Sequence, residues 1–440
     1  MERNFKETKK YLDTFINYEK STSYVYKKDL KLKRVKFLFR VLQIPYGRLK
    51  AIHIAGTKGK GSSATFIAYI LAKQGFRVGL YTSPHFIDLR ERIRILKSNG
   101  KRVLNTMISR REVVRIVDIF KPYLEKMRFT EKFGKITFFE VYTALAFKYF
   151  LDKNLDYVVL EVGLGGRFDA TNVVNPLISV ITHIGYDHTQ KLGKRIKDIA
   201  YEKAGIIKKK IAVVVSHQKK SALDVIYKKA KEMDSPLYVL NKDFYYHNIK
   251  LGRTYTHFDF TYRNFVLKDI RISLKGMHQI DNASLAIMAV YLITKDRNKS
   301  AFKEALKEAY IEGRFEVVSR DPFVIVDIAH NPSSFMALRK NLDAYFPQKK
   351  IILIFAASSD KDVKKMLSLF DYDKLILTSF NNPRSFTPGE IISLAGVEAD
   401  IACNLKSALK RAYTYYNKGC IIVISGSFFL VAEAKKIFKK

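Results

Sequence analysis

Cysteine and long apolar runs are both scarce in this chain of 440 residues. The two cysteines, Cys403 and Cys420, have no close partner for a metal site, and they exclude a disulfide framework. Such cysteine usage is typical of a reducing cytoplasm. No uncharged apolar run approaches the length of a bilayer span, and the charged N-terminus lacks the apolar core of a signal peptide. We therefore expect a soluble, cytoplasmic protein with no membrane partner.

Acidic residues are also few: 42 Asp and Glu face 79 Lys and Arg, which gives a formal net charge of +37. Nucleic-acid binding, an anionic small substrate and a generally lysine-rich surface would each produce this balance. The basic residues spread over the whole length, with only small clusters at 31–36, 90–94 and 208–210. Spread charge is typical of a solvated surface, so we expect no nucleic-acid partner.

The most informative segment present is residues 51–63, AIHIAGTKGKGSS. An apolar run leads into glycine-rich backbone around Lys60, and a helical pattern follows as far as Gly75. Glycines let backbone N–H groups converge on phosphate oxygens, while the helix N-terminus and the lysine supply positive charge. However, Ile54 and Gly61 stand where the generic P-loop has a glycine and a Ser or Thr. The loop alone therefore leaves an ordinary strand-to-helix turn open.

A doubly wound α/β domain is predicted around this loop, after amphipathic helices within residues 1–50. Buried-strand runs alternate with helical patterns; the strands are 77–81, 157–162, 177–182 and 211–216, and the helices 137–151 and 196–204. Ligands of such sheets bind beyond the carboxyl ends of the strands. The motif loops after Ile54, Tyr81, Val162 and Thr182 lie at such ends, which predicts one shared site.

A second, smaller α/β domain is predicted at the C-terminus. Residues 242–275 alternate in the manner of a small β insertion, helix 281–293 follows, and the polar stretch 294–300 is the linker candidate. Beyond it come four strand runs: 323–328, 351–356, 374–378 and 421–425. The predicted fold is thus an N-terminal P-loop doubly wound, mostly parallel domain over residues 1–297, plus a Rossmann-like α/β domain over 298–440.

Several polar side chains at the strand ends could carry chemistry. A carboxylate such as Glu161, at the end of a buried strand, must be paired or bind metal. With a hydroxyl and the imidazole of His188, it forms a plausible Mg²⁺ ligand set beside the loop, but an ion pair with Arg167 is the alternative. From spacing alone, Lys203 is a solvated lysine.

In the second domain, Arg314 precedes a strand, and Asp327 and His330 follow it. These three residues could close over a nucleotide bound on the first domain. The alternative is that they are turn residues, because Asn331-Pro332 initiates turns by itself.

Taken together, these motifs resemble the Mur-ligase superfamily and, within it, the dihydrofolate synthase/folylpolyglutamate synthase family. The resemblance covers nearly the whole chain and rests on ten strings in order: HIAGTKGKGS (53–62), YTSPH (81–85) with ERIR (91–94), TFFE (137–140), LEVGLGGRFDATN (160–172), ITHIGYDHTQKLG (181–193), EKAGIIK (202–208), HQIDNASLA (278–286), GRFE (313–316), DIAHNP (327–332) and SGSFFLV (425–431). The chain departs from the family at Lys58, where Asn is usual, and at Phe168, where Leu is usual.

The resemblance implies a role for each motif. Residues expected to bind ATP are Lys58, Gly59, Lys60, Gly61, Ser62, Asn282, Arg314 and Asp327. Residues expected to hold two Mg²⁺ ions are Ser83, Glu161 and His188, aided by a carbamylated Lys203. Residues expected to act in catalysis are Lys60, Lys203 and His330. Residues expected to line the pterin pocket are Thr137, Phe138, Phe139, Glu140, Phe168, Asp169 and Ala170, with Phe139 stacking on the ring and Asp169 hydrogen-bonding it.

The implied activity is ATP-dependent addition of L-glutamate to dihydropteroate or a reduced folate through an acyl phosphate, with release of ADP and phosphate. We expect a monomer with these small-molecule substrates. Two alternatives remain at this stage: another Mur-type ligase acting on a cell-wall precursor, and a basic nucleic-acid-binding P-loop protein. TFFE and GGRFDATN speak against the first, because they belong to the family's pterin pocket.

Overall fold

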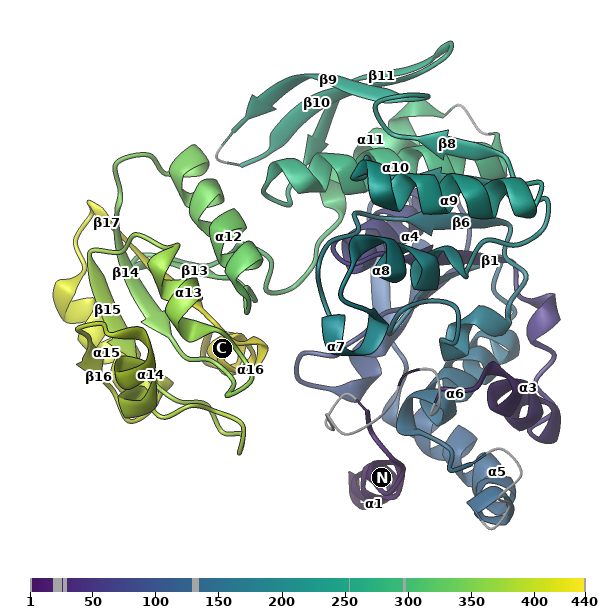
Figure 1. Cartoon of the computed structure of the whole chain (residues 1–440), viewed down its shortest axis with the longest axis horizontal. Helices are drawn as coiled ribbons and strands as arrows, with labels where there is room; N and C mark the ends of the chain where they lie inside the picture. The colour runs from purple at the N-terminus through teal and green to yellow at the C-terminus, as the bar shows by residue number, and fades with distance from the viewer. Residues whose placement is uncertain are drawn as a thin grey trace. The chain divides into compact units, whose positions relative to one another are not determined.

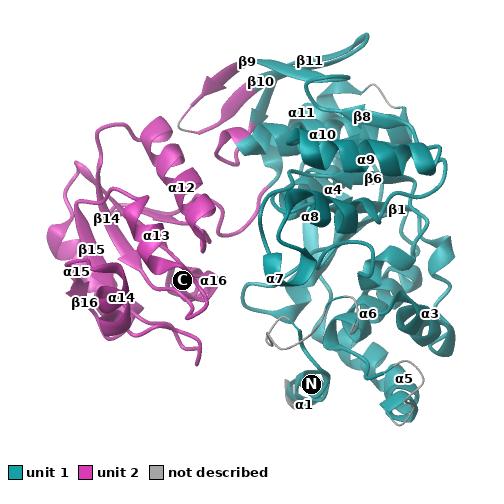
Figure 2. Ribbon diagram, viewed as in Figure 1, with its two compact units in different colours: residues 1–248, 258–271, 278–309 teal, residues 249–257, 272–277, 310–440 magenta. Residues whose placement is uncertain are grey.

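The computed structural model describes residues 2–18, 26, 30–128, 134–252, 254–295 and 298–438. These form two compact units (Figure 2): unit 1 comprises 1–248, 258–271 and 278–309, and unit 2 comprises 249–257, 272–277 and 310–440. Residues 1, 19–25, 27–29, 129–133, 253, 296–297 and 439–440 lie outside the described residues. They fall within the predicted N-terminal domain with its helical region and β insertion, the linker and the C-terminal domain. Compactness in space does not fix a boundary along the chain, so the division at 297/298 stays a prediction.

Unit 1 is built on an eight-stranded sheet in the order β4-β3-β2-β5-β1-β6-β7-β8. The strands are β1 (Ala51–Ala55), β2 (Val78–Tyr81), β3 (Ile93–Ser98), β4 (Val103–Met107), β5 (Tyr157–Glu161), β6 (Ile178–Ile181), β7 (Val213–Val215) and β8 (Leu237–Val239). Six neighbouring strands run parallel, from β2 to β8, and β3 and β4 are antiparallel at one edge. The predicted mostly parallel sheet is confirmed.

The central strands are buried throughout because helices cover both faces of the sheet. Every residue of β1, β2 and β6 is buried. The helices are α1 (Glu2–Asp13), α3 (Leu32–Val41), α4 (Lys60–Lys73), α5 (Arg110–Arg128), α6 (Phe138–Asp152), α7 (Thr189–Leu192), α8 (Ile196–Ala204), α9 (Lys220–Glu232), α10 (Met277–Thr294) and α11 (Lys299–Glu308) (Figure 1). Short 3-10 turns occur at η1 (Tyr46–Arg48), η2 (Leu89–Arg92) and η4 (Ala170–Val173).

Helix α4 carries the loop side of the candidate site. It packs against β1, β2, β3 and β5, and α11 packs on it as well. This double coverage explains why its sequence is apolar nearly all round. Glu308 fastens α11 in place: its carboxylate oxygens lie 3.0 Å from Lys73 Nζ and 2.5 Å from the Val103 amide.

The predicted β insertion is a three-stranded sheet in the order β11-β10-β9. Its strands are β9 (Tyr245–Leu251), β10 (Thr256–Tyr262) and β11 (Phe265–Ile272). Residues of β10 alternate strictly between buried and half-buried, as the sequence pattern predicts.

Unit 2 contains a six-stranded sheet in the order β12-β13-β17-β14-β15-β16, with β12 antiparallel and the others parallel. The strands are β12 (Glu316–Arg320), β13 (Phe323–Val326), β14 (Lys350–Phe355), β15 (Lys374–Leu377), β16 (Asp400–Ile401) and β17 (Cys420–Ser425). The helices are α12 (Pro332–Tyr345), α13 (Val363–Ser368), α14 (Pro388–Ala395), α15 (Leu405–Tyr415) and α16 (Phe428–Phe438). The predicted C-terminal α/β fold is confirmed. In the part of the chain that the structure describes, no helix is long and apolar enough to cross a membrane.

Candidate functional site

Four adjacent strands, β2, β5, β1 and β6, end at the candidate site in unit 1. The loops that leave them begin at Thr82, Val162, Gly56 and Thr182. Because these strands are parallel neighbours, their carboxyl ends lie at one edge of the sheet. The sequence prediction that these four motif loops share one edge is confirmed.

The loop between β1 and α4 has the backbone of a tight cradle. Gly56 and Gly59 have φ angles of +151° and +89°, which residues with a side chain rarely adopt. A β-carbon at Gly56 would lie 1.8 Å from Thr182 Oγ1, and one at Gly59 would lie 2.1 Å from Asn282 Oδ1. Only glycine fits at either position, because the side chains of Thr182 and Asn282 contact the loop backbone directly.

The loop is also tied to the segment after β6. The amides of Thr57 and Lys58 donate to the His183 carbonyl at 2.9 and 3.2 Å. Thr57 Oγ1 lies 3.1 Å from both the amide nitrogen and the carbonyl oxygen of Gly185. Helix α4 then begins at Lys60, so its N-terminal amides and the Lys60 ammonium lie on one small stretch of chain. This arrangement suits a phosphate group.

Asn282 joins the same site from α10. It is buried, and its Nδ2 donates to Gln279 Oε1 at 3.1 Å. Ser63 Oγ, in the first turns of α4, lies 3.5 Å from both the backbone and the side-chain oxygen of Asn282. The predicted nucleotide-binding residues of unit 1 are therefore brought together.

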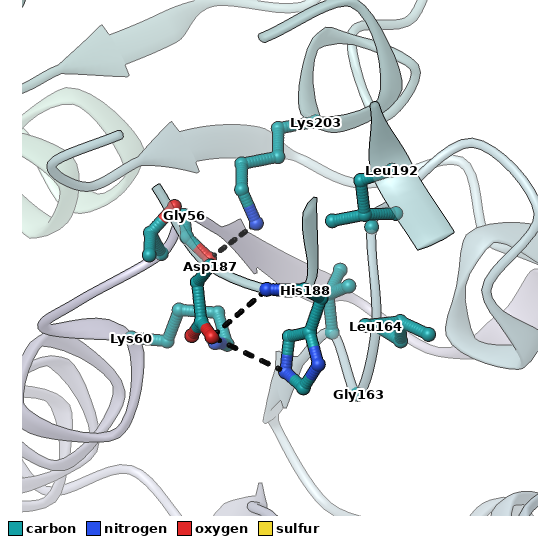
Figure 3. A pocket seen from close by; sticks show the side chains of 11 residues that line it. Gly56, Lys60, Gly163, Leu164, Asp187, His188, Leu192 and Lys203 are labelled. Carbon is teal, nitrogen blue, oxygen red and sulfur yellow. Dashed lines mark hydrogen bonds and ion pairs between the residues drawn. The ribbon is translucent and has the colours of Figure 1, made fainter. Parts of the chain in front are cut away.

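A hollow opens beside the loop (Figure 3). It is lined by Gly56, Thr57, Lys60, Val162, Gly163, Leu164, Gly165, Asp187, His188, Leu192 and Lys203. Two lysines, one carboxylate and one imidazole thus share a small space with the glycine-rich loops after β1 and β5. Asp187 was missed from the sequence, although it stands directly before His188 in the loop that the pattern selected.

Lys203 reaches into this hollow from α8. Its side chain is buried, and Nζ donates to the Gly56 carbonyl at 2.7 Å (Figure 3). Burial, together with the nearby Lys60 ammonium, lowers the pKa of Lys203 from 10.5 to about 7. The alternative of a solvated lysine is wrong. At neutral pH a large fraction of Lys203 carries a free amine, which is a nucleophile.

Glu161 and Ser83 meet at the ends of β5 and β2. The Glu161 carboxylate is buried, and its Oε2 accepts a hydrogen bond from the Ser83 amide at 3.1 Å. The same oxygen lies 3.5 Å from where a β-carbon on Gly61 would stand, so it borders the first turn of α4. Arg167, the alternative partner of Glu161, lies 3.9 Å from Glu202 Oε2 and stacks on the Tyr201 ring at 4.0 Å.

His188 is the most exposed of the predicted metal ligands. Its side chain is 58% exposed, and its φ of +48° turns the chain sharply after Asp187. Its amide donates to Asp187 Oδ1 at 2.9 Å, and its Nε2 lies 3.9 Å from the same oxygen (Figure 3). The imidazole therefore stands at the open side of the hollow.

The predicted pterin residues at the start of α6 divide into two kinds. Thr137 and Glu140 form a capping box, and the buried Glu140 carboxylate also binds Arg34 Nε at 2.9 Å through both oxygens. Phe138 is buried and stacks on Tyr142. Phe139 differs: it is half-buried, and its ring would lie 2.5 Å from a β-carbon on Gly163. Of these four, Phe139 alone lies against the lining of the hollow, at Gly163, and its ring also packs at a tilt against Tyr81 with the ring centroids 6.1 Å apart.

The other predicted pterin residues lie in the loop after β5. Phe168 is half-buried with its ring edge-on to Tyr26, and Ala170 is buried. Asp169 is buried and accepts from the amides of Gly163 and Leu164, each at 3.0 Å. Its carboxylate therefore shapes the loop itself, and the predicted hydrogen bond to a pterin ring stays a prediction.

A second group of predicted residues lies in unit 2, where β13 ends. Asp327 accepts from the amides of Phe315 and Ala329, each at 2.8 Å. Burial raises the pKa of the Asp327 carboxyl, while the exposed Arg314 beside it acts in the opposite direction. His330 Nδ1 lies 2.8 Å from the Ile328 carbonyl, which leaves Nε2 as the outer ring nitrogen. The structure brings Arg314, Asp327 and His330 together within this unit.

Comparison with known proteins first defines the class. A family model described as the Mur ligase middle domain matches residues 118–290. A second, described as the Mur ligase glutamate ligase domain, matches residues 313–428. The chain thus carries two domains of the Mur-type ligases.

Closer relatives define the family. The chain is 34% identical over 416 residues to the dihydrofolate synthase/folylpolyglutamate synthase of Bacillus subtilis, covering 93% of this chain and 95% of that protein. It superposes on the folylpolyglutamate synthase of Thermotoga maritima with a TM-score of 0.86 and 33% identity, covering 100% and 97% of the two chains. The folylpolyglutamate synthase of Mycobacterium tuberculosis complexed with ADP gives a TM-score of 0.89 at 28% identity, covering 100% and 99%.

The chain belongs to the dihydrofolate synthase/folylpolyglutamate synthase family. This membership confirms the predicted family and the predicted ligase class. Neither the cell-wall ligase nor the nucleic-acid-binding alternative is favoured by these relatives.

Proposed function

We propose that this protein uses ATP to join the carboxyl group of a dihydropteroate or reduced folate to the amino group of L-glutamate. The observation that carries the proposal is the hollow in which the phosphate-type loop, Lys60 and the buried Lys203 meet, in a chain of this family. Structures of similar proteins are described as complexed with ADP and as a folylpolyglutamate synthase–AMPPCP–folate complex, which supports ATP and a folate as substrates.

The reaction has two bond changes in sequence. A carboxylate is a poor acyl electrophile, so its oxygen first attacks the γ-phosphorus of ATP, forming an acyl phosphate while the bond to ADP breaks. The glutamate amine then attacks the acyl carbon, loses a proton, and phosphate leaves as the amide forms. Neither step needs a covalent enzyme nucleophile, so catalysis rests on positioning and charge stabilisation.

The loop residues Lys58 to Ser62 supply the phosphate side of this chemistry. Backbone amides of the loop and of the first turn of α4 point toward bound phosphate oxygens, and Lys60 offsets the charge on the transferring phosphoryl group. Asn282, whose Oδ1 leaves no room for a β-carbon at Gly59, would contact the nucleotide. Arg314 and Asp327 would contact the nucleotide, and His330 would act on the glutamate side.

The donor set at the strand ends fits Mg²⁺. The described residues contain no group of three or more His, Cys, Asp and Glu side chains suited to a metal, so ionisable side chains alone would not hold one. Glu161 and Ser83 lie next to each other, with the Ser83 amide 3.1 Å from the Glu161 carboxylate. Both side chains carry oxygen, the ligand atom that Mg²⁺ prefers when substrate phosphates complete its shell. Glu161, Ser83 and His188 would hold the metal, which would offset phosphate charge when bound.

Lys203 fits the proposed carbamate. Its lowered pKa leaves a free amine at neutral pH, and that nitrogen can bond to the carbon of CO₂ with release of a proton. The product is an anion, which replaces a cation beside Lys60 with its opposite and so removes a repulsion. Such an anion would favour a second Mg²⁺ in the hollow.

The acceptor's ring would lie against Phe139, which borders the glycine loop at Gly163, with the segment 168–170 nearby. A monomeric, cytoplasmic enzyme without a nucleic-acid partner completes the proposal. The absence of a nucleic-acid partner is supported by the basic residues, which are spread along the chain rather than concentrated in one arm.

The deciding experiment measures ADP release by the purified protein with L-glutamate and either dihydropteroate or tetrahydrofolate, each tested separately. We expect ADP release that requires both glutamate and one of these acceptors, with a product heavier by one glutamyl residue. ATP turnover that ignores glutamate, or that requires a cell-wall precursor, would overturn the proposal. Salt-sensitive binding of DNA or RNA would support the nucleic-acid alternative instead.

A further inference from the structure

A buried chain of hydrogen bonds connects the strand that carries the phosphate-type loop with the loop after β5. It starts at His53, in the middle of β1 and fully buried, whose Nε2 lies 2.8 Å from Thr171 Oγ1. Thr171 Oγ1 donates to Asp169 Oδ1 at 2.6 Å. The other oxygen of Asp169 accepts from the amides of Gly163 and Leu164. The links among His53, Thr171 and Asp169 join buried side chains, and the two amides at the far end belong to half-buried residues.

The direction of this chain follows from counting hydrogens. A threonine hydroxyl has one hydrogen, and the Asp169 carboxylate takes it, so Thr171 Oγ1 must accept from His53. His53 therefore carries its proton on Nε2. Burial and the nearby Lys208 ammonium lower the pKa of His53 to about 3, so the ring stays neutral at physiological pH. Its Nδ1 is a buried acceptor with no hydrogen-bond partner among the described residues.

An unpaired buried ring nitrogen carries a cost, which a hydrophobic residue at position 53 would avoid. In return, the buried His53 ring provides an N–H donor that fixes the orientation of the Thr171 hydroxyl. That hydroxyl and the Thr171 amide, 3.0 Å from Asp169 Oδ1, orient the carboxylate. The oriented carboxylate holds two successive amides of the segment 163–164, both of which line the hollow.

The position of the segment 163–164 should matter more for binding of the acceptor than for binding of ATP. Gly163 lies against the Phe139 ring, so a shift of the segment changes the space beside that ring. The phosphate-type loop is held by separate contacts, from His183 and Asn282. Loss of the buried chain should therefore disturb the acceptor side while leaving the nucleotide side nearly intact.

We propose that His53 and Thr171 are positioning residues for the acceptor substrate, acting through Asp169 on the segment 163–164. This inference rests on the proposed function, because the acceptor it concerns is the dihydropteroate or folate. Neither residue touches the reacting atoms in this scheme; each fixes the geometry of another group.

The test compares Thr171→Val, which keeps the shape and removes the hydroxyl, with Thr171→Ser, which keeps the hydroxyl. Thr171→Val should raise KM for the acceptor about tenfold while KM for ATP stays within about twofold, as expected for a lost buried hydrogen bond on one side of the site. Thr171→Ser, which keeps the hydroxyl, should leave KM for the acceptor within about threefold of the wild-type value.

Ser179→Ala is the matched control. Ser179 is buried on β6 beside His53, and its hydroxyl donates to the Ile206 carbonyl instead of the Asp169 chain. It should reduce Tm without changing the ratio of the two KM values. Equal rises of both KM values in Thr171→Val, or the same ratio change in Ser179→Ala, would overturn the inference.

A second variant guards against misfolding of Thr171→Val. His53→Gln keeps a side-chain N–H donor, so we expect it to raise KM for the acceptor less than Thr171→Val does. If the ratio of the acceptor KM to the ATP KM is unchanged both in a folded His53→Gln protein and in Thr171→Val, the inference is overturned. Wild-type ligation is measured first. Its absence with every folate acceptor refutes the proposed function, which is a different result from an unchanged KM ratio in an active enzyme.

Discussion

Replacing Lys203 by Met should stabilise the protein, and by an amount that depends on pH. Methionine has a similar length and no charge, so it fills the same buried position at the hollow. Folding lowers the pKa of Lys203 from 10.5 to about 7, chiefly through burial. The unfolded chain therefore binds this proton more tightly than the folded chain does, and the charged lysine opposes folding.

The size of the effect follows from that difference. At about pH 6 the lysine is charged in both states, and the full penalty of roughly 5 kcal/mol applies, since one pKa unit equals about 1.4 kcal/mol. At about pH 9 the folded lysine is neutral while the unfolded one is still charged, so the penalty falls to roughly 2 kcal/mol. The destabilising term thus shrinks as pH rises from about 7 toward 10.5.

The measurement is urea denaturation of wild type and Lys203→Met at both pH values, in buffer free of CO₂ so that no carbamate forms. The variant loses the hydrogen bond to the Gly56 carbonyl at both pH values, so that loss cancels in the comparison. We expect the stabilisation to be larger at the lower pH by about 3 kcal/mol. Lys197→Met, an exposed lysine on the same helix, is the control. A stabilisation that is independent of pH, or larger at the higher pH, would refute the reasoning.

Three further changes probe the rest of the site. Lys203→Ala should keep the fold and lose ligation, with partial rescue by an added short carboxylic acid; full activity would rule out the carbamate. Glu161→Gln should abolish Mg²⁺-dependent turnover, and an unaltered Mg²⁺ response would rule out its ligand role. Gly59→Ala should weaken ATP binding at least about tenfold, because its β-carbon would lie 2.1 Å from Asn282 Oδ1. Gly75→Ala is its control, because Gly75 also has a positive φ, +96°, but a β-carbon there would have no atom within 4 Å. Equal ATP affinity in the two variants would contradict the clash at Gly59.

The parallel sheet of unit 1 was predictable because its strands are buried on both faces. The run Tyr157–Glu161 is apolar up to its last residue, Ile178–Ile181 is interrupted only by Ser179, and no helix-period pattern competes with either. Glycine spacing then located the strand ends. From those two facts alone, the meeting of the loops after β1, β2, β5 and β6 follows.

Burial of single side chains was not predictable in the same way. Lys203 looks like any other of the many lysines in sequence, and its low pKa depends on α8 turning it toward Gly56. Likewise His53 reads as one polar residue in an apolar strand, because Thr171, its partner, lies 118 positions away. Glu140 and Asp169, predicted to contact substrate, have both carboxylate oxygens engaged within the protein. Such pairings form only when distant segments pack.

The irregular spacing of the loop at residues 51–63 now has a structural reason. In the generic P-loop, a Ser or Thr follows the lysine and supplies a hydroxyl beside the phosphates. Here Gly61 stands in that place, and the nearest side-chain atom to its missing β-carbon is Oε2 of Glu161, at 3.5 Å. The carboxylate oxygen beside Gly61 therefore comes from the end of β5 rather than from the loop, and the amide of Ser83, just after β2, donates a hydrogen bond to it. A site whose oxygen donors come from neighbouring strands requires no hydroxyl at position 61, so the departure from the generic spacing is a consequence of how the sheet shares one site among its strands.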